Sequence, residues 1–290
     1  MLDLFLRNIT VAAYRHDLSK VEKLVTQLLE FAPIPIVQID HNSKFQRVRN
    51  NYHGEIFLSE SEISFRKDAW NIKEFGRANI PYSSKFYCSL SSKYINEIRL
   101  INVLETNKEF RQKQSIRKRQ VFTSGQWVST RPLYVAIFPF NKFAVISNDE
   151  IRSHLEKYQT IMNTFSKEQQ QNCKRILPFI SHFLSAKHIN NHWDYLISAF
   201  CSELILDKYN LDGILYPSVR ADFKSYNLVL QPEAVLNKLY LQKAAMFELL
   251  LNRQIAVIDN VADGEISFGN TILWSQLERT SENKMNRMLE

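Results

Sequence analysis

The spacing of apolar residues changes along this chain, and those changes do most to limit the folds that it can adopt. Up to residue 31, apolar residues recur at helical spacing with charged residues between them. From about residue 45 they occur in short runs typical of strands, and residues 148–209 return to a mostly helical pattern. A chain that mixes both periods in this way predicts an α+β core with added helices at the N-terminus and in the middle of the chain.

The same pattern suggests how the chain is organised. Pro33 and Pro35 end the first helical stretch, so we expect residues 1–40 to form a helical N-terminal extension. We expect residues 41–290 to form one domain with a largely helical insertion around residues 148–209, broken near Pro178 and Asn190.

Individual elements can be predicted for several segments. Residues 84–90 predict a strand with Phe86 and Cys88 on one face and Tyr87 on the other, followed by a helix over 92–105. Residues 120–128, with a turn at Ser124 and Gly125, predict a hairpin with the strand 133–138. Short strands are expected at 46–49, 214–216, 227–230, 255–258 and 265–268, and a helix at the end of the chain; residues 238–251 fit a helix or a strand.

Composition excludes some functions and favours others. The 290 residues carry a net charge of +7, and the pI of about 9.2 favours an anionic partner such as a nucleic acid, a nucleotide or an acidic protein. Only 6 glycines argue against a glycine-rich phosphate loop. Much of the excess charge lies in residues 111–119; since no aromatic residue interleaves with those charges, a solvated face is favoured over a nucleic-acid patch.

Cysteine usage and hydropathy point to a cytoplasmic protein. Three widely spaced cysteines form neither a disulfide framework nor a metal-ligand pattern, and Cys201 is expected in the core. His188 and His192 have the spacing of a metal pair but lack the accompanying glutamate, so no metal site is expected. The longest apolar run, residues 132–140, is too short to cross a bilayer, so no membrane association is expected.

The most informative segment for chemistry begins with Gly76-Arg77-Ala78-Asn79-Ile80-Pro81. Tyr87 follows Arg77 by ten residues in a predicted strand, and Glu97 follows it by twenty in the next predicted helix. An arginine fork can hold a pyrophosphate, and a tyrosine ring can stack on a nicotinamide or adenine ring. A carboxylate can bind ribose hydroxyls and stabilise a developing oxocarbenium charge.

Glu97 lies at the edge of an apolar helix face. That face is formed by Tyr94, Ile98, Ile101 and Leu104. A carboxylate turned toward the interior is costly unless it is paired or used in function. The alternative is a buried Arg77–Glu97 ion pair that only holds the fold together.

A second segment places a serine at the end of a sheet. Ser218 follows a short strand that ends in Pro217, so its hydroxyl can point into a cleft and bind a ribose or a phosphate. No glycine pair flanks it, which excludes a nucleophile elbow. The alternative is a serine that only stabilises its turn.

Taken in order, these segments resemble the RES-domain family, which is named for an arginine, a glutamate and a serine. The matching stretches are residues 76–81, Phe86-Tyr87, Glu97, Tyr216-Pro217-Ser218 and residues 227–230. The resemblance implies that Arg77, Tyr87, Glu97 and Ser218 are catalytic. It also implies that Asn79, Tyr216 and one of the arginines Arg47 and Arg49 bind the substrate.

The resemblance also implies a fold and an activity. The family's fold is similar to that of ADP-ribosyltransferases, and its members are typically toxins that consume NAD by hydrolysis or phosphorolysis, or transfer ADP-ribose. Their usual partner is an antitoxin with a helix-turn-helix domain. We therefore expect an NAD-consuming toxin or defence effector that could form homo-oligomers. The alternatives are a mono-ADP-ribosyltransferase acting on a protein, or a protein- or nucleic-acid-binding module on the same scaffold.

The chain departs from the family pattern in places. The resemblance covers residues 45–235, and the N-terminal helices lie outside it. The family often has an aromatic residue at the position of Ala78 and a glycine at the position of Tyr82. We therefore expect Tyr82 to change the shape of the turn beside Arg77. Glu97 and Ser218 are also farther apart than in compact members, which suggests a specialised branch of the family.

Overall fold

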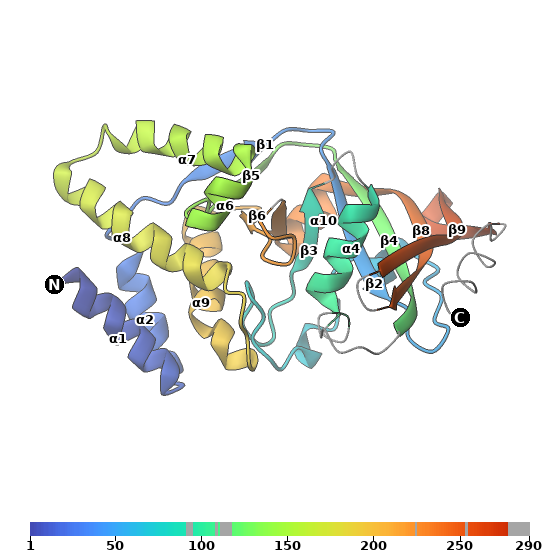
Figure 1. Cartoon of the computed structure of the whole chain (residues 1–290), viewed down its shortest axis with the longest axis horizontal. Coiled ribbons are helices and arrows are strands. Elements are labelled where there is room, and N and C mark those ends of the chain that lie inside the picture. The colour runs from blue at the N-terminus through green and yellow to red at the C-terminus, as the bar shows by residue number, and fades with distance from the viewer. Residues whose placement is uncertain (91–94, 108–109, 111–117, 224, 253–254, 278–290) are drawn as a thin grey trace. The chain divides into compact units, whose positions relative to one another are not determined.

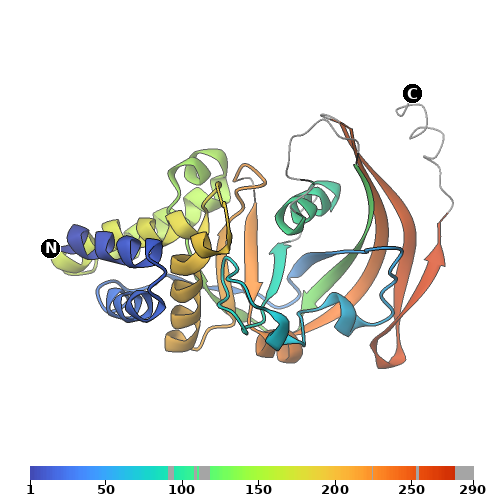
Figure 2. The ribbon, with the colours of Figure 1, turned by 90° about the horizontal axis from the view of Figure 1, so that it is seen from below.

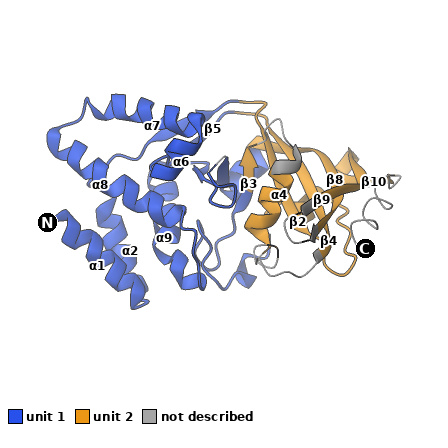
Figure 3. Ribbon diagram, in the orientation of Figure 1, with its two compact units in different colours: residues 1–40, 66–87, 132–237 blue, residues 41–65, 88–131, 238–290 orange. Residues whose placement is uncertain are grey.

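The computed structural model describes residues 1–90, 95–107, 110, 118–223, 225–252 and 255–277 (Figure 1). The chain divides into two compact units that alternate along the sequence (Figure 3). Unit 1 contains residues 1–40, 66–87 and 132–237, and unit 2 contains residues 41–65, 88–131 and 238–290.

Unit 1 contains most of the helices. These are α1 (Leu2–Tyr14), α2 (Leu18–Leu28), α6 (Lys142–Ser147), α7 (Asp149–Met162), α8 (Lys167–Leu184), α9 (Leu196–Tyr209) and α10 (Pro232–Lys238), with the short turns η1 (Ala69–Asn71) and η2 (His192–Tyr195). Their starts follow from capping side chains: Asp17, Asn141, Asn148 and Ser166 each accept a hydrogen bond from a first-turn N–H. Helices α1, α2, α8 and α9 pack against one another through buried aliphatic side chains.

The strands of unit 1 follow the order β1-β5-β6-β7, with β1 (Ile36–Ile39), β5 (Leu133–Ile137), β6 (Gly213–Pro217) and β7 (Tyr226–Leu230). β5 and β6 are parallel, whereas the other two pairs are antiparallel. Every residue of β6 and β7 is buried. A Cβ atom at Gly213 would lie 2.2 Å from the Val229 carbonyl oxygen, so only glycine allows this close approach. The loop that carries Ser218 therefore leaves a buried hairpin.

Unit 2 is a curved antiparallel sheet with the order β3-β2-β4-β8-β9-β10. Its strands are β2 (Lys44–Asn50), β3 (Phe86–Leu90, of which the last three residues belong here), β4 (Lys118–Ser129), β8 (Leu239–Asn252), β9 (Ile255–Ser267) and β10 (Thr271–Gln276). The helix α4 (Ile95–Thr106) lies inside the curve of this sheet (Figure 2). Its Val103 packs with Phe122, Phe247 and Leu249, and the rings of Phe122 and Phe247 stack 5.6 Å apart. Unit 2 also contains the short helix α3 (Glu60–Ile63), which lies just before the chain continues into unit 1 at residue 66.

Much of the predicted secondary structure is confirmed. The chain is a mixed α/β protein, residues 2–28 form two helices, and the predicted strands at 46–49, 84–90, 214–216 and 227–230 correspond to β2, β3, β6 and β7. The ambiguous segment from 238 is the strand β8. None of the helices in the described ranges has the length and apolar character needed to cross a membrane.

The predicted hairpin of residues 120–128 with 133–138 is wrong. β4 runs straight through Ser124 and Gly125 and pairs with β2 and β8, whereas β5 pairs with β1 and β6. Gly125 is required by packing, because a Cβ atom there would lie 2.8 Å from the Trp127 indole nitrogen and 3.0 Å from Leu241.

A further prediction, of a helix break, is wrong, because Pro178 lies inside α8 and does not break it. The strands predicted at 255–258 and 265–268 are confirmed up to residue 267, but both belong to one long strand, β9, which pairs with β8 and β10. Thr271–Gln276 forms the strand β10, and the helix predicted for the end of the chain falls on residues 278–290, which lie outside the described ranges.

Candidate functional site

The segment that carries Arg77 forms a tight turn closed by Tyr87. The Gly76 N–H donates to the Asn79 carbonyl (2.9 Å), the Tyr87 hydroxyl donates to Asn79 Oδ1 (2.7 Å), and it accepts from the Ala78 N–H (3.0 Å). A Cβ atom at position 76 would lie 2.2 Å from Asn79 Oδ1. Gly76 is thus required for the turn, and Asn79 and Tyr87 together fix its shape.

Tyr82, which stands where the family often has glycine, adopts a left-handed backbone conformation with φ of +64°. This is a conformation that glycine adopts readily and other residues rarely. Its N–H donates to the Ile72 carbonyl (2.7 Å), and its ring is 62% exposed beneath the Lys73 ammonium at 4.7 Å. The backbone at position 82 therefore has a conformation typical of glycine, and the tyrosine side chain lies at the surface.

Arg77 is buried and binds the end of helix α8. Its side chain donates from Nη1 to the Leu184 carbonyl (2.8 Å) and from Nη2 to the Ala186 carbonyl (3.2 Å), and its guanidinium lies 5.2 Å from the centre of the Tyr195 ring. Carbonyl groups at the C-terminal end of a helix lack helical partners and carry partial negative charge. Arg77 satisfies those carbonyls, so it fastens the end of α8 to the turn.

Ser218 organises the loop between β6 and β7. Its side chain is fully buried, its Oγ accepts from the Ala221 N–H (3.3 Å), and its backbone pairs with Ser225 (2.8 Å) and Phe223 (2.9 Å). Asp222 and Phe223 both have positive φ, which makes this a strained turn. The turn-stabilising role considered for this serine is therefore present in the structure.

Arg220 lies in the same loop and reaches the segment that Arg77 binds. Its Nη2 donates to the Lys187 carbonyl (3.2 Å), one residue from the Ala186 carbonyl that Arg77 uses. Its Nε is buried without a hydrogen-bond partner, as is the hydroxyl of Ser225. An unsatisfied buried donor of this kind costs about 1–3 kcal/mol.

The two arginines have no acidic partner in the described part of unit 1. No carboxylate in the described ranges lies within ion-pair distance of Arg77 or Arg220, and the nearby Lys187 pairs with the exposed Asp222 at 3.5 Å. Two guanidinium groups that converge on one backbone segment, one with an unused donor, favour an anionic ligand.

A second polar group lies near Tyr87. The buried ammonium of Lys85 binds Glu203 Oε2 (2.9 Å) and Gln231 Oε1 (2.7 Å), and Glu203 Oε1 is buried without a partner. Burial raises the pKa of the Tyr87 phenol well above its ordinary value; the Ala78 N–H and Arg77 oppose this, whereas Tyr195 and Glu203 add to it. The Tyr87 phenol therefore stays protonated at neutral pH and acts as a neutral ring and hydrogen-bonding group.

Sequence reasoning missed Lys85, Glu203 and Arg220. Glu203 offered one signal, because it is a carboxylate next to Leu204 in the apolar stripe of α9. Tyr216, predicted to bind substrate, is 3% exposed in the core of unit 1. His192 accepts a hydrogen bond from the Phe75 N–H (3.5 Å). In the part of the chain that the structure describes, no group of three histidine, cysteine or acidic side chains is placed to hold a metal ion.

The remaining predicted residues belong to unit 2. Arg47 donates to the Ile63 carbonyl (3.2 Å), and Arg49 donates to the Glu62 carbonyl with its guanidinium 4.9 Å from the centre of the Phe57 ring. Both arginines therefore bind the end of α3. Glu97 lies in α4, and its side chain falls outside the described part of the structure, as do residues 111–117. Arg119, at the end of that basic stretch, forms an ion pair with Glu248.

Within unit 1 the structure thus brings Arg77, Asn79 and Tyr87 together. Arg77 and Arg220 then connect this turn and the Ser218 loop to one segment, residues 184–187.

Comparisons with solved structures give distant likenesses, one of which is described here. No protein-family model matches the chain, and no curated protein matches it. A solved structure, the crystal structure of the M. tuberculosis MbcT–MbcA toxin–antitoxin complex, is similar with a TM-score of 0.36 and 11% sequence identity. The match covers 79% of this chain and 92% of that one.

Proposed function

We propose that this chain is an NAD-consuming enzyme of the RES type, with an ADP-ribosyltransferase-like fold, that cleaves the bond between nicotinamide and ribose. The observation that carries the proposal is the pair of guanidinium groups, Arg77 and Arg220, on the segment 184–187, with no carboxylate in ion-pair range among the described residues and with Arg220 Nε buried and unpartnered. A pyrophosphate carries two negative charges and accepts hydrogen bonds in the plane of a guanidinium fork.

The proposed reaction needs orientation and charge stabilisation more than strong acid or base groups. The bond from ribose C1′ to the nicotinamide nitrogen breaks, and its electron pair leaves with neutral nicotinamide. Water or phosphate then attacks C1′, and attacking water loses a proton. Glu97 would stabilise the positive charge that grows on the ribose. The ring of Tyr87, with its neutral hydroxyl, would lie against the nicotinamide.

The other predicted residues would hold the substrate. Arg220 and Arg77 would bind the pyrophosphate, and the Ser218 loop would position the ribose or a phosphate between β6 and β7. Asn79 would keep Tyr87 in place through the 2.7 Å hydrogen bond. Tyr216 and one of the arginines Arg47 and Arg49 would complete the set of substrate-binding residues.

The test is release of free nicotinamide from NAD by the purified chain. We expect release by the wild type and a loss on the order of 100-fold or more in Glu97→Gln, the size found when a transition-state stabiliser is removed. Glu105→Gln changes the same charge on the same helix and should retain activity. Equal release by wild type and Glu97→Gln, or none by either, would exclude this cleavage reaction.

The biological role proposed here is that of a cytoplasmic toxin or defence effector. Expression should slow growth, Glu97→Gln should relieve the effect, and a helix-turn-helix antitoxin co-expressed with the chain should co-purify with it. Labelled NAD distinguishes protein ADP-ribosylation from release to water or phosphate. Salt-sensitive binding of nucleic acid that survives Glu97→Gln but not the combined replacement of Arg117, Lys118 and Arg119 would instead favour a binding module.

A further inference from the structure

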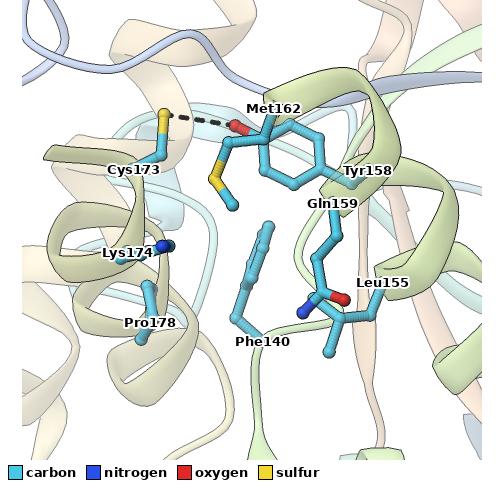
Figure 4. A pocket seen from close by; sticks show the side chains of 8 residues that line it. All are labelled: Phe140, Leu155, Tyr158, Gln159, Met162, Cys173, Lys174 and Pro178. Atoms are coloured by element: carbon cyan, nitrogen blue, oxygen red, sulfur yellow. Dashed lines mark hydrogen bonds between the residues drawn. The ribbon is translucent and has the colours of Figure 1, made fainter. Parts of the chain in front are cut away.

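A cavity of about 200 Å³ lies between helices α7 and α8 of unit 1 (Figure 4). It lies apart from the turn of Arg77 and the loop of Ser218, and none of the residues of the proposed NAD site lines it. Its walls are mostly apolar: Phe140, Leu155, Tyr158, Met162 and Pro178.

The size and shape of this cavity suit a single aromatic ring. An apolar cavity of about 150 Å³ in another protein is large enough for benzene, so about 200 Å³ accommodates a ring with a small substituent. Phe140 and Tyr158 meet edge to face, with ring centres 5.4 Å apart, and Figure 4 shows Phe140 pointing into the space below Met162. Aromatic edges and a thioether are favourable neighbours for another aromatic ring.

The inner end of the cavity is uncharged. The single hydrogen of the Tyr158 hydroxyl is shared between two acceptors, the Pro33 carbonyl (3.2 Å) and Cys173 Sγ (3.4 Å). Burial raises the pKa of both the Tyr158 phenol and the Cys173 thiol, so neither group ionises at neutral pH. This end therefore suits the apolar part of a ligand.

The rim carries a positive charge and hydrogen-bond donors. Lys174 from α8 and Gln159 from α7 line the cavity from opposite sides, both are exposed, and no lining residue is acidic (Figure 4). Lys174 takes part in no ion pair within the described ranges of the chain. An ammonium and an amide on either side of an apolar opening are complementary to a carboxylate.

We propose that this cavity is a binding site for a small aromatic carboxylate. The ring lies against Phe140 and Met162, and the carboxylate lies at the rim between Lys174 and Gln159. The inference does not depend on NAD cleavage.

The probe for this site is 4-fluorophenylacetate, followed by ¹⁹F NMR on the full chain. A ligand of this size should bind saturably with a Kd on the order of 0.1–1 mM. The neutral control 4-fluorophenylacetamide has the same shape and should bind about 2- to 5-fold more weakly, because an exposed charge pair contributes little. Lys174→Gln should remove that difference, whereas Lys157→Gln, an exposed lysine of α7 that does not line the cavity, should keep it.

Filling the cavity provides the second arm of the test. Met162→Trp should abolish binding of both probes, and Leu155→Trp is a second filling variant that replaces a less buried side chain. Circular dichroism identifies the variants that are folded. Three results would overturn the proposal. They are no saturable binding of 4-fluorophenylacetate to the wild type, equal affinity of the wild type for 4-fluorophenylacetate and 4-fluorophenylacetamide, or undiminished binding to a folded variant in which tryptophan fills the cavity.

Discussion

Replacing Arg77 by lysine keeps the charge but removes the fork that fastens the end of α8. The guanidinium donates to two carbonyls from different residues, Leu184 and Ala186, and lies on the Tyr195 ring. A lysine ammonium lacks the planar fork that spans both carbonyls, so we expect it to bind only one of them. The other is left without its partner, which costs about 1–3 kcal/mol, and the lost ring contact costs about 0.5–1 kcal/mol more. We therefore expect a loss of roughly 2–4 kcal/mol.

The readout is the midpoint of thermal unfolding, measured by circular dichroism. A destabilisation of this size should lower Tm by about 3–7 °C in a chain of this length. Arg66→Lys is the matched control, because its ion pair with Asp68 is 47% exposed on the arginine side and contributes under about 1 kcal/mol. If the two variants unfold at the same temperature, Arg77 does not fasten α8, and the reasoning is refuted.

Three further predictions each concern a single residue. Arg220→Gln should raise KM for NAD about 5- to 20-fold through loss of a charged hydrogen bond, with Tm within 2 °C or so of wild type; an unchanged KM in an active enzyme would remove Arg220 from the substrate site. Gly76→Ala should cost about 1–3 kcal/mol, because its Cβ would lie 2.2 Å from Asn79 Oδ1, and an unchanged Tm would show that the turn can relax. Burial raises the pKa of the Cys201 thiol to about 12 from an ordinary 9.0. The preference of the folded state for the protonated thiol therefore stabilises the protein fully below pH 9, and this stabilisation is lost as pH rises toward 12. Cys201→Ala should reduce the fall of Tm above pH 9, and an equally steep fall in this variant would contradict the prediction.

Local patterns were sufficient to predict the elements that local contacts form. Helices α1 and α2 follow from helical spacing with charged residues between, and the alternation in β3 correctly placed Phe86 and Cys88 on a buried face. The failures involve pairing between distant segments. Ser124-Gly125 has the composition of a turn, yet the packing of Trp127 and Leu241 around Gly125 keeps it in a strand. Gly125 and Leu241 are more than a hundred residues apart in the sequence, so no local pattern predicts that they are in contact.

The candidate site shows the same division. The order of Gly76, Arg77, Asn79 and Tyr87 was sufficient to single out one turn, because those residues contact each other over a short stretch. The buried group of Lys85, Glu203 and Gln231 could not be predicted, because its members come from residues 85, 203 and 231 and meet only in the folded chain. Arg220 was overlooked for a related reason: its target, the Lys187 carbonyl, lies on a loop with no sequence signature of its own.

The role of Arg77 changes most when its contacts are considered. From sequence, the alternatives were a pyrophosphate anchor and an ion pair with Glu97. The structure adds a third partner, the backbone of α8, which takes two of the donors of the guanidinium group. A guanidinium has five N–H donors, so two bonds to carbonyls leave room for a phosphate while holding the fork in one orientation. An arginine fixed in this way loses little conformational entropy when an anion arrives. Fastening α8 and binding pyrophosphate are therefore compatible, and Arg77→Lys should impair both, whereas Arg220→Gln should impair binding alone.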